Sequence, residues 1–182
     1  MKELSLHIMD IAQNSIRAEA TFIEISIEEN LVLNILFICI KDNGKGMDSD
    51  TLARSIDPFY TSRNTRKVGL GLSLLKQNAE MAGGSFTIES LEKIGTTVKA
   101  NFQLNHIDRA EMGDLPGVIT LLVGANPNLE FVYTHNVNHQ IYIFDTREIK
   151  EALDNLPLNL PEVLANLKEM ITENLKDIQA ST

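Results

Sequence analysis

The sequence Asp42-Asn43-Gly44-Lys45-Gly46-Met47 is a glycine-containing turn that comes just after the apolar segment from Leu31 to Ile40. The apolar segment predicts a central, buried strand, and no strand continues through the glycines. The glycines have no Cβ atoms, so other groups can approach this backbone closely, and Asp42 can accept a hydrogen bond from the exocyclic amine of a purine. A plain tight turn is the alternative interpretation, because Asp-Asn-Gly is a common turn sequence.

Before this turn the sequence predicts a helix and a strand. Residues Leu4 to Ala18 place apolar side chains and Ser15 on one helical face, and Thr21 to Glu28 alternates with the period of two that is typical of a half-buried strand. The helix also carries a polar stripe, with the residues His7, Asp10, Asn14 and Arg17. This stripe is either a solvated face or a site in which Asn14 gives an amide oxygen to Mg²⁺ and Asp10 holds or deprotonates a water.

After the turn we expect a short helix from Asp48 to Ser55 and a loop from Asp57 to Val68. The loop contains Arg63, Arg66 and Lys67, and Gly69-Leu70-Gly71-Leu72-Ser73 then opens a helix that continues to Met81. Backbone N–H groups at a helix start, beside basic side chains, predict an anion site that suits phosphates. A basic loop stands where the dinucleotide fingerprint requires a strand, and the phosphate-loop motif is absent.

The order of the elements favours a two-layer α/β sandwich over a doubly wound parallel sheet. Gly83-Gly84 ends the helix, and Ser85 to Ser90 with Thr96 to Leu104 then predict an antiparallel pair of strands. Helices and antiparallel strands in this order place the helices on one face of the sheet.

Taken together, the segments resemble the N box, first glycine box, F box and second glycine box of the GHKL superfamily, the ATP-binding fold of gyrase, chaperones, histidine kinases and mismatch-repair proteins. The resemblance covers residues 4–104 and lies with the histidine-kinase branch. Its motifs are residues 10–18 for the N box, Asp42 to Gly46 for the first glycine box, Asp57 to Arg63 for the F box and Gly69 to Ser73 for the second glycine box.

The resemblance implies a Bergerat-type fold that binds ATP and Mg²⁺. It gives Asp10 the role of catalytic base or water holder and Asn14 that of Mg²⁺ ligand. The implied nucleotide-binding residues are Asn14, Asp42, Gly44, Gly46, Met47, Phe59, Arg63, Lys67, Gly69, Leu70, Gly71, Leu72 and Thr96. The chain departs from the kinase pattern at Lys67, where a further glycine is usual, and at Asp10, where hydrolytic relatives have glutamate.

A histidine kinase carries its phosphoaccepting histidine on a helical hairpin before the ATP-binding domain, and we expect this sequence to lack such a hairpin, because it starts close to the first predicted helix. We therefore expect a signalling kinase catalytic domain that acts on a separate protein, as in two-component signalling. His7 lies within the nucleotide-binding helix, where we expect packing or a hydrogen bond and not phosphorylation. The alternatives are a slow ATP hydrolase that uses Asp10 as base, and a non-catalytic module whose partner surface is gated by nucleotide.

Composition supports a cytoplasmic protein without a nucleic-acid partner. The 182 residues carry a net charge of −9 and are 43% hydrophobic, which argues against nonspecific nucleic-acid binding and is enough for a core. No apolar run reaches the length of a membrane span, and the N-terminal segment lacks the features of a signal peptide. The single cysteine, Cys39, excludes an intramolecular disulfide.

A boundary is expected near residue 104, between an ATP-binding domain (1–104) and an acidic C-terminal extension (105–182). The two parts carry net charges of −2 and −7. In the extension we expect a small meander of strands at Val118 to Val123, Leu129 to Thr134 and Gln140 to Phe144, and then two helices starting after Asp145 and at Pro161. The extension can dock a partner, form a dimer or cover an exposed edge of the sheet.

Overall fold

The structure is a computed structural model that describes residues 3–56, 71–154 and 156–181. Within these residues the helices are α1 (Leu4–Arg17), α2 (Ser49–Ser55), α3 (Gly71–Met81), α4 (Leu115–Ala125), α5 (Thr146–Ala152) and α6 (Pro161–Asp177). The strands are β1 (Phe22–Asn30), β2 (Ile35–Asp42), β3 (Ser85–Leu91), β4 (Gly95–Gln103), β5 (Glu130–Val137) and β6 (Gln140–Asp145).

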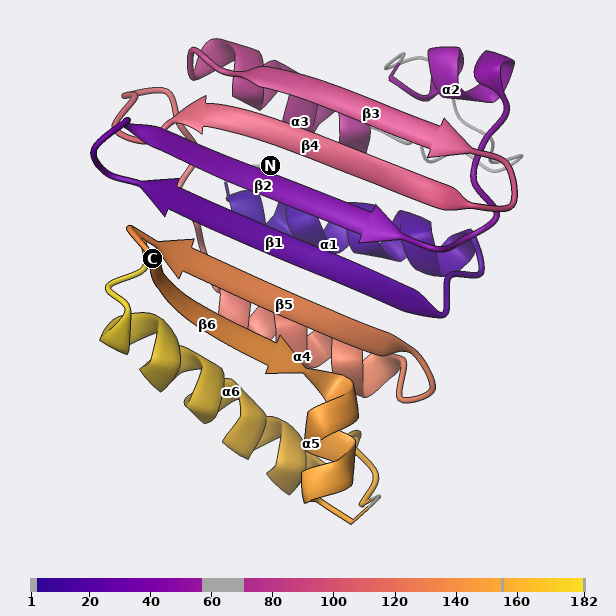
Figure 1. The fold of residues 1–182 in the computed structure, drawn as a ribbon, viewed down its shortest axis with the longest axis vertical. Coiled ribbons are helices and arrows are strands. Elements are labelled where there is room, and N and C mark those ends of the chain that lie inside the picture. The colour runs from indigo at the N-terminus through magenta and orange to yellow at the C-terminus, as the bar shows by residue number, and fades with distance from the viewer. Residues whose placement is uncertain (1–2, 57–70, 155, 182) are drawn as a thin grey trace.

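The described strands form one sheet in the order β3-β4-β2-β1-β5-β6. Neighbouring strands are antiparallel, apart from β1 and β5, which pair in parallel. Figure 1 shows α1, α3 and α4 on one face of the sheet, and α6 packs against α4 and β6. The expected two-layer α/β sandwich is therefore confirmed.

The core lies between the sheet and this helix layer. Ile23, Ile25 and Ile27 of β1 are at most 1% exposed, as the period of two predicts for a strand with one buried face. On α1 the predicted stripe of Leu4, Ile8, Ile11 and Ser15 is buried as well. Each fully buried aliphatic side chain of this kind stabilises the fold by about 1.5–3 kcal/mol relative to an exposed one.

The second strand is shorter than expected, because residues 31–34 form a turn and β2 begins only at Ile35. The side chain of Asn30 accepts a hydrogen bond from the Leu33 amide at 2.8 Å, and Asn34 has a left-handed backbone with φ +57°. Asparagine is well suited to both roles. The apolar run concealed this turn, whose three aliphatic side chains are exposed.

The prediction of a strand at Val118 to Val123 is wrong, because these residues belong to helix α4. The Asp114 side chain caps the helix by accepting a hydrogen bond from the Gly117 amide at 2.8 Å. Since α4 packs against α1 on one side and α6 on the other, it is apolar around most of its circumference. Such a helix has no amphipathic period and resembles a buried strand in sequence.

Residues 105–182 enlarge the sheet and do not form a separate meander. Strand β5 pairs with β1 from Phe22 opposite Glu130 to Glu29 opposite Val137, so the extension covers the edge of β1. On α6 the apolar stripe is buried within the chain, at Val163, Leu167, Ile171 and Leu175. The division near residue 104 stays a prediction, although the sheet runs through both parts.

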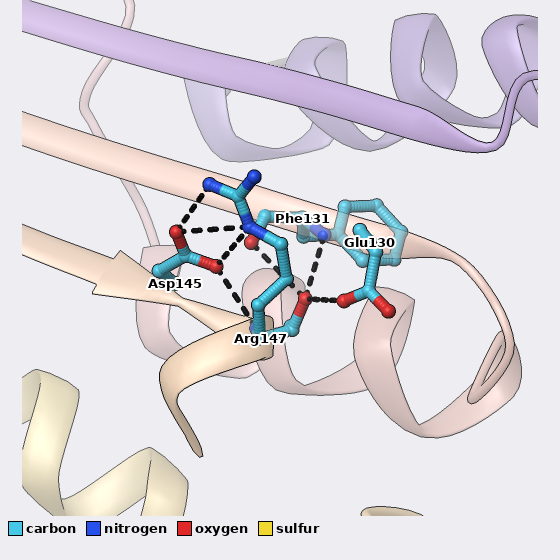
Figure 2. A network of polar contacts seen from close by, with 5 residues as sticks. Glu130, Phe131, Asp145 and Arg147 are labelled. Carbon is cyan, nitrogen blue, oxygen red and sulfur yellow. Dashed lines mark hydrogen bonds and ion pairs between the residues drawn. The ribbon is translucent and has the colours of Figure 1, made fainter. Parts of the chain in front are cut away.

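The corner between β6 and α5 is fixed by a polar network (Figure 2). Asp145 caps α5, as predicted, by accepting a hydrogen bond from the Arg147 amide at 2.9 Å, and its carboxylate pairs with the Arg147 guanidinium at 2.6 Å. The Thr146 hydroxyl accepts a hydrogen bond from the Phe131 amide and donates one to Glu130. Strand β5 is thereby joined to the start of α5.

A membrane-spanning helix needs about 20 apolar residues. Within residues 3–56, 71–154 and 156–181, none of the helices has the necessary length and apolar character.

Candidate functional site

Asp42, at the end of β2, connects three elements through its carboxylate. Oδ2 accepts a hydrogen bond from the Ser15 hydroxyl of α1 at 2.6 Å, and Oδ1 accepts from the amides of Gly44 at 2.9 Å and Thr96 at 3.3 Å. The residue is only 8% exposed. Because each carboxylate oxygen has two lone pairs, Asp42 is held in one orientation and can still accept a further hydrogen bond.

The turn after Asp42 requires glycine at Gly46. This residue has φ +65°, and a Cβ atom there would lie 2.0 Å from the carbonyl oxygen of Leu91. The turn therefore passes directly against the β3–β4 hairpin, which no residue with a side chain permits without a backbone shift.

A hydroxyl pair ties the same turn to β3 and β4. The Met47 amide donates to the Ser90 hydroxyl at 2.9 Å, and the hydroxyls of Ser90 and Thr96 are 2.8 Å apart. The predicted residues Asp42, Gly44, Gly46, Met47 and Thr96 are therefore brought together at one end of the sheet.

The polar stripe of α1 is graded in exposure, from buried His7 through half-buried Asp10 to exposed Asn14 and Arg17. An Arg17 guanidinium nitrogen donates a hydrogen bond to the amide oxygen of Asn14. Asp10 faces the start of α3, because a Cβ atom on Gly71 would lie 3.2 Å from the Asp10 carboxylate. The structure thus places the first residue of α3 against the acid of the predicted N box.

The chemistry of these oxygen donors suits Mg²⁺, which binds few protein ligands and keeps several waters, and the Arg17 guanidinium would have to leave the Asn14 oxygen for the metal to bind it. The donors are the Asn14 amide oxygen and, one turn earlier on α1, the Asp10 carboxylate. In the part of the chain that the structure describes, no group of three or more histidine, cysteine, aspartate or glutamate side chains could hold a metal ion. Any Mg²⁺ held here would therefore depend on waters and a bound ligand for its remaining coordination.

The start of α3 is described from Gly71 onward. Gly71 is buried, and Leu72 packs against the hydrophobic core. The other predicted phosphate and lid residues lie outside the described residues, and their roles stay predictions: Phe59, Arg63, Lys67, Gly69 and Leu70.

Comparison with known sequences identifies the family. Residues 2–106 match the family described as histidine kinase-, DNA gyrase B-, and HSP90-like ATPase. The chain belongs to this ATPase family.

A putative sensor protein from Shewanella frigidimarina is 35% identical over 109 residues, or 59% of this chain and 17% of that protein. The sensor histidine kinase YvrG from Bacillus subtilis is 29% identical over 94 residues, or 50% of this chain and 16% of that protein. The chain thus spans less than a fifth of the length of these two relatives.

Solved structures share the fold of this ATPase family member at low sequence identity. The N-terminal domain of a DNA repair protein superposes with a TM-score of 0.55 and 17% identity, over 80% of this chain and 52% of that one. The ATPase domain of MutL from Aquifex aeolicus, complexed with ADP, gives a TM-score of 0.50 and 14% identity over 85% and 70% of the two chains. Since residues 2–106 are less than 80% of the chain, the shared fold includes part of the segment that follows them.

His7 of this ATPase domain is fully buried, and its Nε2 atom lies 2.7 Å from the Asn78 side-chain nitrogen on α3. Burial lowers the pKa of His7 from 6.5 to about 4, so the imidazole is neutral near pH 7. The prediction of packing or a hydrogen bond for this histidine is confirmed, and the structure shows both.

Three residues of the site were missed as site residues by the sequence analysis. Ser15 orients Asp42, Ser90 supports the turn, and Asn43 accepts hydrogen bonds from the Thr21 and Phe22 amides at 2.9 Å. One signal was available for Ser15, because a hydroxyl on an apolar helical stripe needs a buried partner. Ser90 and Asn43 depend on contacts between segments that are distant in sequence.

Proposed function

We propose that this chain binds ATP with Mg²⁺ and acts as the catalytic part of a signalling kinase on a separate protein, in the manner of two-component signalling. The observation that carries the proposal is the Asp42 carboxylate, which is oriented by three hydrogen bonds at the end of β2 and borders a turn of glycines. This arrangement suits the exocyclic amine of adenine. Family membership, the names of the sensor histidine kinase relatives and the ADP in the MutL structure support the same ligand.

In this proposal the ATP phosphates bind at the start of α3. Gly71 lies against Asp10, and a helix N-terminus attracts anions through its unpaired N–H groups. Arg63 and Lys67, which precede α3 in the sequence, add positive charge. Asn14 would hold Mg²⁺ directly and Asp10 through water. The bound metal supplies charge neutralisation on the phosphates.

Substitution of Asp42 by asparagine tests the adenine assignment. Asp42→Asn replaces one acceptor oxygen by an amide donor, and we expect ATP affinity to fall about tenfold or more, because a lost hydrogen bond to a charged group is worth about 1.5–3 kcal/mol. Isothermal titration calorimetry measures the change. Asp50→Asn, an equal charge change at the exposed start of α2, is the control, and unchanged ATP affinity in Asp42→Asn contradicts the assignment.

A second test addresses the metal. In Asn14→Ala we expect ATP affinity to lose most of its dependence on Mg²⁺, because the predicted direct ligand is gone. The same titration is run with Mg²⁺ and with EDTA. An affinity that still rises with Mg²⁺ as in the wild type excludes Asn14 as the ligand.

Slow ATP hydrolysis is the second candidate, and the half-buried Asp10 carboxylate beside Gly71 favours it. ATP labelled on the γ-phosphate separates the possibilities. Free phosphate that is lost in Asp10→Asn indicates hydrolysis with Asp10 as base, whereas label on an added partner protein indicates the kinase. Tight ATP binding without either product, with partners supplied, favours a nucleotide-gated binding module.

A further inference from the structure

Helices α1 and α3 touch through a polar seam at two points. His7 lies 2.7 Å from Asn78 late in α3, and Asp10 lies beside Gly71 at its start, where an added Cβ atom would be 3.2 Å from the Asp10 carboxylate. The earlier residue of α1 thus meets the later residue of α3, so the two helices run antiparallel along the seam. Any sliding of α3 along α1 would move Gly71 away from Asp10.

Burying a histidine at position 7 costs free energy that packing alone does not require. Asn78 donates to Nε2, which places the proton of the neutral imidazole on Nδ1. That atom is buried and has no hydrogen bond of good geometry among the described residues, while a weaker interaction with the Gly71 backbone raises the pKa of His7 against the larger effect of burial. An unpaired buried donor destabilises a fold, and an apolar side chain of similar size would avoid the cost. The best-attested use of a buried polar pair between two helices is to fix their register.

The buried aliphatic side chains of α3 constrain this register less than a directional hydrogen bond does. Leu75 and Ala79 are the other buried residues of α3 after Gly71, and aliphatic contacts tolerate small shifts because they are not directional. The hydrogen bond from Asn78 to His7 is directional, and it lies two turns of α3 from Gly71.

We propose that His7 is a positioning residue which, through Asn78, sets α3 along α1 so that the first turn of α3 lies opposite Asp10 and receives the nucleotide phosphates. This inference rests on the proposed function, because the position of Gly71 matters for binding only if phosphates bind there. We therefore expect His7 to affect binding of the phosphates but not binding of adenine, which is assigned to Asp42.

Titration with ATP and with adenosine, which has no phosphates, separates an effect on phosphate binding from an effect on adenine binding. In His7→Leu we expect ATP affinity to fall about five- to tenfold, the equivalent of one lost hydrogen bond, while adenosine affinity stays unchanged. His7→Gln, whose amide oxygen can replace Nε2 as acceptor, should retain most of the ATP affinity. Leu75→Val, a change of packing on the buried face of α3, is the control and should leave the ratio of the two affinities unchanged.

Several results would overturn the inference. If His7→Leu weakens ATP and adenosine equally, or weakens neither, His7 has no positioning role. If wild-type protein binds neither ligand, the proposed function fails and the inference with it, so the two failures are distinguishable. Asn78→Leu tests the same hydrogen bond from the other helix if His7→Leu does not fold, and circular dichroism checks the fold of each variant.

Discussion

At the scale of single residues, the site depends on polar side chains that are buried with their partners in place. Asp42 illustrates this, since Ser15 lies on the apolar face of α1 and donates to it at 2.6 Å. The glycines and Asp42 itself could be predicted from sequence, because turns and strand ends have local signatures. The Ser15 donor could not be paired with Asp42 in advance, because the pairing depends on how α1 packs on the sheet.

Removal of the Ser15 hydroxyl should affect both stability and ligand affinity. We expect Ser15→Ala to lower the free energy of unfolding by about 2 kcal/mol, because a nearly buried carboxylate loses a charge-assisted hydrogen bond. ATP affinity should fall a few-fold as Asp42 becomes less well oriented. Urea denaturation and calorimetry measure the two effects. Ser49→Ala at the exposed start of α2 is the control, and a stability equal to wild type in Ser15→Ala would show that this bond contributes little.

At the scale of elements, helices with one polar face and strands with one polar face could be predicted, and an element that is apolar around most of its circumference could not. Helix α1 and strand β1 each carry the expected period. Helix α4 does not, because it is covered on several sides, and its apolar run resembles a strand in sequence. The Asn30–Asn34 turn was missed for a similar reason, since its aliphatic side chains continue the pattern of the strand.

Strands β1 and β5 also share a buried polar chain at the end of the sheet away from Asp42. The Tyr133 hydroxyl lies 2.7 Å from His135 Nδ1, and His135 Nε2 lies 2.7 Å from the Glu29 carboxylate. The Ser181 amide donates to Glu29 at 2.9 Å. Glu29 is 1% exposed, so these hydrogen bonds replace those that water gives to an exposed carboxylate. They anchor the segment after α6 to the central sheet.

The hydrogen-bonded side chains of Tyr133, His135 and Glu29 predict that part of the stability of the fold is sensitive to acid. Burial alone would raise the pKa of Glu29, but the hydrogen bonds with His135 and Ser181 outweigh burial and lower it from 4.5. The stabilisation is therefore complete above about pH 4.5 and is lost as the pH falls through the lower pKa of the folded state, because the unfolded chain takes up the proton first. Denaturant melts between pH 3 and pH 7 should show unfolding free energy falling in that acidic range.

The substitution Glu29→Gln isolates this contribution. We expect it to lower the free energy of unfolding by roughly 3 kcal/mol at pH 7, as is usual when one partner of a buried pair is removed, and to flatten part of the acid slope. Glu28→Gln is the matched control, because Glu28 is the neighbouring residue on β1 and is exposed. Equal acid slopes in the two variants would assign the acid sensitivity to other groups.

At the scale of the whole molecule, the part that matches the ATPase family and the part that follows it share one sheet. Residues 2–106 carry the family match, yet the edge of β1 is completed by β5, and Leu4 and Ser5 donate backbone hydrogen bonds to Glu111 and Met112 at 2.8 Å. The charge difference between residues 1–104 and 105–182 favours a boundary between them. Composition does not reveal that a distant strand pairs in parallel with β1.

A fragment that ends at residue 106 should therefore be less stable and less soluble than the whole chain. It would expose the edge of β1 and the apolar surface beneath α4, and exposed edges pair with other chains. Size-exclusion chromatography and binding of a hydrophobic dye measure this, with the full chain as control. A monomeric fragment that binds no dye and gives a cooperative melt would show that the family-matched part folds without the rest.

The parallel pairing of β1 and β5 has a consequence for the newly made protein. Paired residues are 108 positions apart, from Phe22 with Glu130 to Glu29 with Val137. At a synthesis rate of about 5–20 residues per second, β1 leaves the ribosome on the order of 5 to 20 s before its neighbour exists. During that interval the nascent chain carries an open strand edge rich in isoleucine, which makes it a natural client for chaperones that shield unfinished sheets until translation is complete.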